Sequence, residues 1–119
     1  MRTDLASMNP GKAMAQASHA SNQFVDTLPE DAYEMYDQWL QCNGFGTVLV
    51  LGVTSEQMFE AVGNAELAKF QSDIVHDPSY PLRDGDTTHY IPLDTCGYVF
   101  GDKDDPSLQK ILGNFELHD

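Results

Sequence analysis

The most constraining feature of the sequence is one uninterrupted apolar run. Residues 47–53 read Thr-Val-Leu-Val-Leu-Gly-Val, so the run is rich in β-branched side chains and carries no charge. A strand that is exposed on one face alternates polar and apolar residues, whereas a strand that is covered on both faces does not. The run therefore predicts a strand in a sheet that lies between two layers of helices.

Helical signals stand on both sides of this run. Asn9 is a good N-cap, and Pro10 suits the first helical position because its missing N–H would have no partner there. Thr54 and Gln57 have the spacing of a capping box at the start of another helix. The expected helices cover residues 10–25, 30–41, 54–67 and 105–112.

The other extended segments are short. The expected strands cover residues 2–5, 73–76, 87–93 and 115–117, and residues 77–85 are expected to form a turn-rich loop. The alternation of helices and strands predicts a single three-layer α/β domain over residues 1–119. Its mixed β-sheet is expected to have about four strands with helices on both faces. If Met1 is the true start of the chain, the first strand is expected to be shortened to residues 2–5 or missing. Either the sheet is smaller or a second subunit supplies the missing edge, which makes a homodimer one expectation.

Composition narrows the class of protein. The chain has 119 residues, of which 41% are hydrophobic and 10% aromatic, values that are ordinary for a folded domain. No apolar run is long enough to span a bilayer, and the N-terminus lacks a signal-peptide core, so we expect no membrane association. Cys42 and Cys96 are expected to be free thiols in a reducing compartment. We therefore expect a cytoplasmic protein.

Three functional side chains share one face of the first expected helix. Lys12, Gln16 and His19 are separated by four and three residues, which places them on one stripe. The stripe begins in the first helical turn, where backbone N–H groups attract negative charge. An ammonium, an amide and an imidazole in this place form a candidate site for an anion or an ester. The alternative is a helix of small residues in which the Lys and the His form no site, and such helices are common.

A longer pattern surrounds this stripe. The segment 2–5 reads Arg-Thr-Asp-Leu and is followed by Met8-x-x-Gly11-Lys12-x-x-Ala15-Gln16-x-x-His19-Ala20. Further matches follow in order at Trp39-Leu40, Val75-His76-Asp77, Gly85, Thr88 and the Gly-Asn-Phe-Glu-Leu of residues 113–117. This series resembles the type 2 peptidyl-tRNA hydrolases, the archaeal and eukaryotic kind.

The resemblance implies a hydrolase that cleaves the ester between a peptide and the 3'-terminal ribose of tRNA. Its substrate partner is then peptidyl-tRNA, and it needs no cofactor and no metal. By similarity, Lys12 and Asp77 belong to the catalytic set, and Thr88 matches a hydroxyl that holds the site together. His19 is expected to be a base or an orienting donor, since either protonation state is accessible near neutral pH. The expected substrate-binding residues are Asn9, Gly11, Gln16 and Gly85.

Other features favour a different function. Pro81 stands where the family has a threonine, and Ala6 and Ser7 stand where it has an additional lysine. The formal net charge of -13 opposes binding of a polyanion. No acidic residue lies between Asp4 and Asp26, however, and salt screens the rest of the charge. The alternative function is a non-catalytic domain of the same fold that binds a basic partner through its acidic segments.

A third hypothesis is a metal site. Its ligands would come from His76, Asp77, Asp84, Asp86 and His89. These oxygen and imidazole groups have no recognised ligand spacing, so a solvated loop is the simpler interpretation and no metal is expected.

Overall fold

The four expected helices form close to their predicted bounds. The structure is a computed structural model that describes residues 1–119, apart from the side chain of Asn43. Its helices are α1 (Pro10–Asp26), α2 (Tyr33–Gln41), α3 (Ser55–Leu67) and α4 (Pro106–Leu112). One-turn 3-10 helices cover Glu30–Ala32 and Cys42–Gly44. Together with the strands below, they make the protein α/β, as predicted.

The helix starts follow the capping signals of the sequence. The side chain of Asn9 accepts a hydrogen bond from Lys12 N at 2.8 Å, and Pro10 occupies the first helical position of α1. Thr54 and Gln57 make both bonds of the capping box before α3. These side chains satisfy N–H groups that have no partner within the helix, so they fix where each helix begins.

One long hairpin replaces the predicted strand, loop and strand. β1 (Gln71–Asp84) pairs antiparallel with β2 (Thr87–Phe100). The prediction of a loop over residues 77–85 is wrong, because the backbone stays extended through Asp84. The turn has two residues, and Gly85 has a φ of 60°, the positive value that two-residue hairpin turns favour at their first central position.

The expected sheet of four strands does not form. The described residues make one regular sheet of two strands, and the other segments contribute isolated bridges. Arg2 pairs with Val53 in parallel, and Leu51 pairs with Leu117 antiparallel. The first strand is thus reduced to one bridge. The run 47–53 lacks partners long enough to cover it, and the side chains of Val48 and Leu49 are each 69% exposed. The prediction of burial on both faces is therefore wrong for this run.

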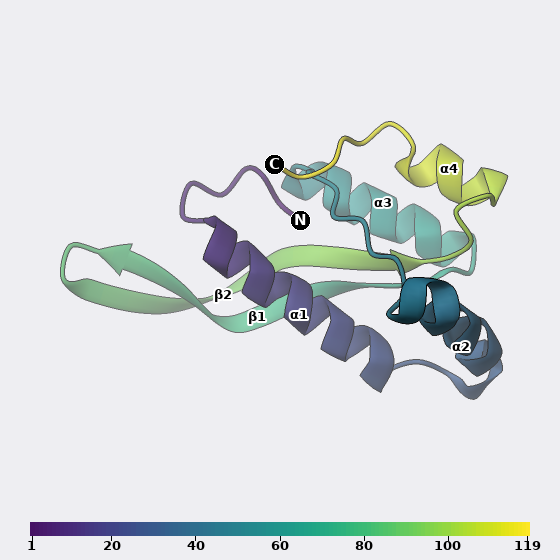
Figure 1. The fold of residues 1–119 in the computed structure, drawn as a ribbon. Helices are drawn as coiled ribbons and strands as arrows, with labels where there is room; N and C mark the ends of the chain where they lie inside the picture. Colours follow the sequence, from purple (N-terminus) through teal and green to yellow (C-terminus); the bar gives the residue numbers. More distant parts are fainter.

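Two helices cover opposite faces of the hairpin (Figure 1). Cys96 and Tyr98 belong to the core that packs against α1. The residue between them, Gly97, faces α3, where an added Cβ would lie 2.8 Å from a methyl group of Val62. Successive side chains of a strand point to opposite faces, so this alternation places the hairpin between α1 and α3.

The end of the hairpin extends beyond the helices. Residues 82–89, which we call the hairpin arm, project from the body of the molecule (Figure 1). The principal extents are 48 × 26 × 25 Å, and the radius of gyration is 15.0 Å. A compact domain of this length would have a radius of gyration of about 13.5 Å. The arm therefore explains the elongated shape.

The structure also bears on the expectations about membrane-spanning helices and cysteines. None of the helices in the described residues has the length and apolarity that crossing a membrane requires. Cys42 and Cys96 are free thiols, the first exposed and the second buried. The expected homodimer stays a prediction.

Candidate active site

Lys12 lies in the first turn of α1 and reaches the base of the hairpin arm. Its Nζ donates to the carbonyl oxygens of Pro81 at 2.8 Å and Ser7 at 3.2 Å. The ammonium also lies 5.1 Å from the centroid of the Tyr80 ring, a favourable cation–π distance. An ammonium has three N–H donors, so these two bonds leave one for a ligand.

Gln16, one turn further along α1, connects two side chains of the hairpin. Its Nε2 donates to Asp77 Oδ2 at 2.7 Å, and its Oε1 accepts from the hydroxyl of Thr95 at 2.6 Å. A carboxylate only accepts, so the amide nitrogen must face Asp77. Gln16 is only 3% exposed. The amide is therefore buried between Asp77 and Thr95, and its expected contact with substrate stays a prediction.

Asp77 lies where the hairpin is irregular. The register shifts between Val75 and His76 and again between Asp77 and Tyr80, so the strand bends around the carboxylate. Its Oδ1 accepts from Ser79 N at 2.9 Å. Each carboxylate oxygen thus has one protein donor and retains acceptor capacity for a further hydrogen bond.

Tyr80 anchors the hairpin arm against the segment that precedes α1. Its side chain is fully buried, and its hydroxyl lies 3.0 Å from the hydroxyl of Ser7. The same residue supplies the ring that faces the Lys12 ammonium. Tyr80 therefore links Lys12 on α1 to the strand that carries Asp77.

The structure brings together only some of the predicted site residues. From one face of α1, Gln16 bonds Asp77 and Lys12 bonds the carbonyl of Pro81, four residues further along the same strand, whereas the side chain of His19 is exposed. Thr88 is exposed in the hairpin arm and pairs with Arg83, six residues beyond Asp77. At the rise of an extended strand, six residues span about 20 Å.

The remaining expected residues lie at two places. Asn9 caps α1 through its side chain, and Gly11 is exposed in the first turn of that helix. Gly85 forms the turn of the hairpin, beyond Thr88.

Sequence reasoning missed Thr95. This residue is fully buried and supplies the hydroxyl that contacts Gln16. The available signal was the Asp-Gly pair at residues 84–85, which is typical of a tight hairpin turn. Counting outwards from the two-residue turn at residues 85–86 places residue 94, and not Thr88, opposite Asp77, and the register shifts make Leu93 its actual partner.

The metal hypothesis gains no support from the hairpin. His76 Nδ1 lies 2.8 Å from Asp94, and His89 Nε2 lies 3.9 Å from Asp84, as two separate pairs. The described residues contain no group of three or more His, Cys, Asp or Glu side chains that could hold an ion.

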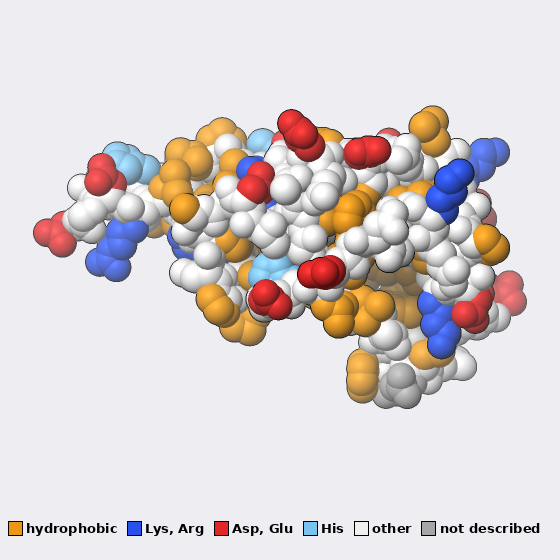
Figure 2. Space-filling model, turned by 90° about the horizontal axis from the view of Figure 1, so that it is seen from above, with side chains coloured by type: hydrophobic (Ala, Val, Ile, Leu, Met, Phe, Trp, Pro, Cys, Tyr) orange, Lys and Arg blue, Asp and Glu red, His pale blue; other side chains and the backbone are white. Residues whose placement is uncertain are grey.

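The protein as a whole is acidic, with a formal net charge of -13. Figure 2 shows isolated Lys and Arg side chains on one face of the molecule, with acidic side chains beside them. Arg2 is used internally, because its Nε donates to Asp4 at 2.8 Å. That hydrogen bond holds the pKa of Asp4 below its usual value. Any attraction of an anion therefore depends on a few local donors.

A comparison with models of protein families places the chain. The family model described as peptidyl-tRNA hydrolase PTH2 matches residues 1–118. A comparison with curated proteins gives no match.

Proposed function

Because the chain belongs to the peptidyl-tRNA hydrolase PTH2 family, we propose that it hydrolyses the ester between a peptide and the 3'-terminal ribose of tRNA. The family match supports a hydrolase of this kind that acts in translation. The observation that carries the finer proposal is the contact series Thr95–Gln16–Asp77, together with the bond of Lys12 to Pro81 on the strand that carries Asp77. A role in translation agrees with the cytoplasmic location expected from the sequence.

Lys12 is the group that stabilises the oxyanion. Attack of water on the ester carbonyl places a negative charge on the carbonyl oxygen, and a fixed cation lowers the energy of that state. Ser7 and Pro81 hold the ammonium through two of its N–H groups. The third N–H donates to the developing oxyanion.

Asp77 is the group that activates water. Gln16 and Ser79 each donate one hydrogen bond to the carboxylate, so its direction is fixed before substrate binds. The remaining acceptor capacity orients the attacking water and receives its proton, which passes to the ribose 3'-oxygen as the bond from this oxygen to the carbonyl carbon breaks. Gln16 and Thr95 act as positioning residues, because they touch Asp77 and each other rather than the reacting atoms.

The binding-module hypothesis remains a second candidate function. The formal net charge of -13 favours it, together with the internal pairing of Arg2. In this case the acidic surface would attract a basic partner at low salt, and the attraction would weaken as salt is added.

Hydrolysis of N-acetyl-phenylalanyl-tRNA distinguishes the two functions. We expect the wild-type protein to release N-acetyl-phenylalanine, and Lys12→Ala and Asp77→Asn each to lower kcat by about a hundredfold or more. Lys110→Ala, a change in the last turn of α4, is the matched control and keeps the wild-type rate. Absence of turnover by the wild-type protein, beside an active hydrolase of the same family, would exclude the enzyme and favour the binding module.

A further inference from the structure

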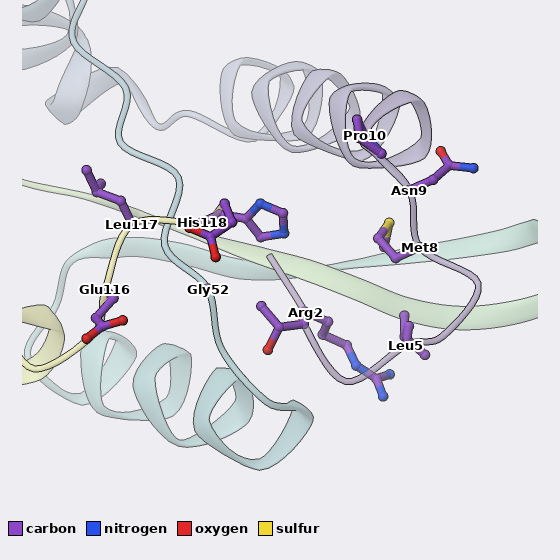
Figure 3. Close-up of a pocket in the computed structure, with 11 residues that line it drawn as sticks. Arg2, Leu5, Met8, Asn9, Pro10, Gly52, Glu116, Leu117 and His118 are labelled. Atoms are coloured by element: carbon purple, nitrogen blue, oxygen red, sulfur yellow. The ribbon is translucent and has the colours of Figure 1, made fainter.

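A hollow lies between the segment that leads into α1 and the C-terminal segment. Its volume is about 470 Å³, within the usual range for small-ligand sites. Residues 8–10 form one wall, residues 116–118 form the opposite wall, and Gly52 lies between them (Figure 3). The side chains of Met8 and His118 point toward each other across the hollow.

The hollow adjoins the candidate active site. Met8 Sδ lies 4.0 Å from the hydroxyl of Tyr80, the residue whose ring faces Lys12. Asn9 lines the hollow and also accepts the hydrogen bond from Lys12 N. A substrate whose ester carbonyl contacts Lys12 would therefore place one of its two halves, RNA or peptide, in the hollow.

The charges around the hollow indicate whether it binds the RNA half or the peptide half of the substrate. Glu116 and Asp119 are among the residues that line the hollow, so two acidic residues lie at it. The guanidinium of Arg2 is neutralised by Asp4 and also donates to Asp94 O at 3.1 Å. Phosphates of RNA would meet these carboxylates without a free arginine to balance them, and like charges repel. A peptide lacks this charge.

The walls of the hollow also suit a peptide. Leu5, Met8 and Pro10 supply apolar surface, and methionine adapts its shape to different neighbours. His118 supplies the ring nitrogens of an imidazole that points into the hollow (Figure 3). Apolar walls with a few polar groups are typical of sites that bind small organic ligands.

We propose that this hollow binds the peptidyl half of the substrate, at the amino acid next to the ester. The proposal rests on the proposed hydrolase function and adds a preference to it. Neutral or basic side chains at that amino acid bind better than acidic ones, because the acidic residues Glu116 and Asp119 are part of the lining.

Direct binding tests the location without requiring turnover. The probe is N-acetyl-phenylalanine joined to adenosine through an amide in place of the ester, and adenosine alone is the comparison. We expect the probe to shift the backbone NMR signals of Gly52 and His118 in the wild-type protein, and adenosine to leave them unchanged. Equal shifts from adenosine, or no shifts in the hollow from the probe, would overturn the proposal. Binding in the hollow without hydrolysis of any peptidyl-tRNA would overturn the proposed function instead.

Kinetics test the assignment to the peptide half. His118→Trp fills the hollow from one wall, and His89→Trp makes the same change on the exposed hairpin arm as a control. For N-acetyl-phenylalanyl-tRNA we expect His118→Trp to lower kcat/KM by about tenfold or more, with a smaller loss for N-acetyl-glycyl-tRNA. Binding of deacylated tRNA should not change. Equal losses for both substrates, or weaker binding of deacylated tRNA by His118→Trp alone, would contradict a peptide site.

A charge-reversal variant tests the preference for neutral or basic side chains. Glu116→Lys should raise kcat/KM for N-acetyl-aspartyl-tRNA relative to N-acetyl-lysyl-tRNA by several-fold, since one carboxylate is replaced by an ammonium. Glu60→Lys reverses an exposed carboxylate on α3 and serves as the control for total charge. An identical ratio in the two variants would refute the proposed preference.

Discussion

Replacement of Thr95 by valine removes one hydroxyl and nearly keeps the shape of the side chain. Thr95 is fully buried, and its hydroxyl donates to Gln16 Oε1 at 2.6 Å. In Thr95→Val this buried amide oxygen loses its donor. The amide then no longer has a fixed orientation, and the hydrogen bond from its Nε2 to Asp77 becomes weaker.

The structure sets the size of two effects. An unpaired buried polar atom costs about 1–3 kcal/mol of unfolding free energy. With a urea m-value of about 1.5 kcal/mol/M, a loss of about 2 kcal/mol lowers the unfolding midpoint by about 1.3 M. Because Asp77 loses its orientation rather than its charge, we expect kcat to fall by about tenfold or more with little change in KM.

Two further variants distinguish the loss of this hydrogen bond from a general effect of replacing threonine by valine. Thr88→Val makes the same chemical change at an exposed position, so its unfolding free energy should stay within about 0.5 kcal/mol of wild type and its kcat should not change. Thr95→Val combined with Gln16→Met removes both hydrogen-bonding partners. This double variant should regain part of the lost stability, because no amide is left unpaired, but it should not regain kcat.

Urea unfolding followed by circular dichroism and hydrolysis of N-acetyl-phenylalanyl-tRNA measure the two effects. Loss of kcat in Thr88→Val but not in Thr95→Val would show that the wrong threonine has been assigned to the site. A destabilised Thr95→Val with wild-type kcat would limit Thr95 to a structural role and refute the positioning argument.

Two further predictions concern packing and thiol reactivity. Gly97→Ala should lower the unfolding free energy by about 1–3 kcal/mol, because its Cβ would lie 2.8 Å from a methyl group of α3. Gly63→Ala, inside α3 with no atom within 4 Å of the added Cβ, should raise it by about 0.5–1 kcal/mol. Calorimetry that gives the same sign for both would contradict the packing of α3 on the hairpin. A thiol reagent should modify Cys42 and spare Cys96 in the folded protein, since burial raises the pKa of the Cys96 thiol. Mass spectrometry that finds both thiols modified at equal rates would show that Cys96 is accessible.

Local signals explain what the sequence predicted correctly. The start of α3 depends on Thr54 and Gln57, which lie within one turn of each other, and the start of α1 depends on Asn9 and Pro10. Lys12 and Gln16 share a face because helical periodicity fixes their relation. These features need no knowledge of distant segments, so the sequence alone is sufficient for them.

The features that the sequence did not predict depend on pairing between distant segments. The run 47–53 has the composition of a buried strand, but its neighbours in space provide only single bridges at Val53 and Leu51. The identity of the buried threonine depended on the hairpin register, and that register follows from the turn at Gly85. One unrecognised turn therefore changed both the expected sheet and the expected site.

The uncovered run has a consequence for how the protein behaves at high concentration. From residue 38 to residue 55 the chain carries no Asp, Glu, Lys, Arg or His, and Val48 and Leu49 expose most of their surface. Such an uncharged segment with exposed apolar side chains favours self-association, whereas the large negative charge elsewhere makes the molecules repel one another in solution. Acidification towards about pH 4 neutralises the carboxylates and removes that repulsion. The excess of acids then acts as a colloidal stabiliser, and its loss leads to precipitation that begins at this segment.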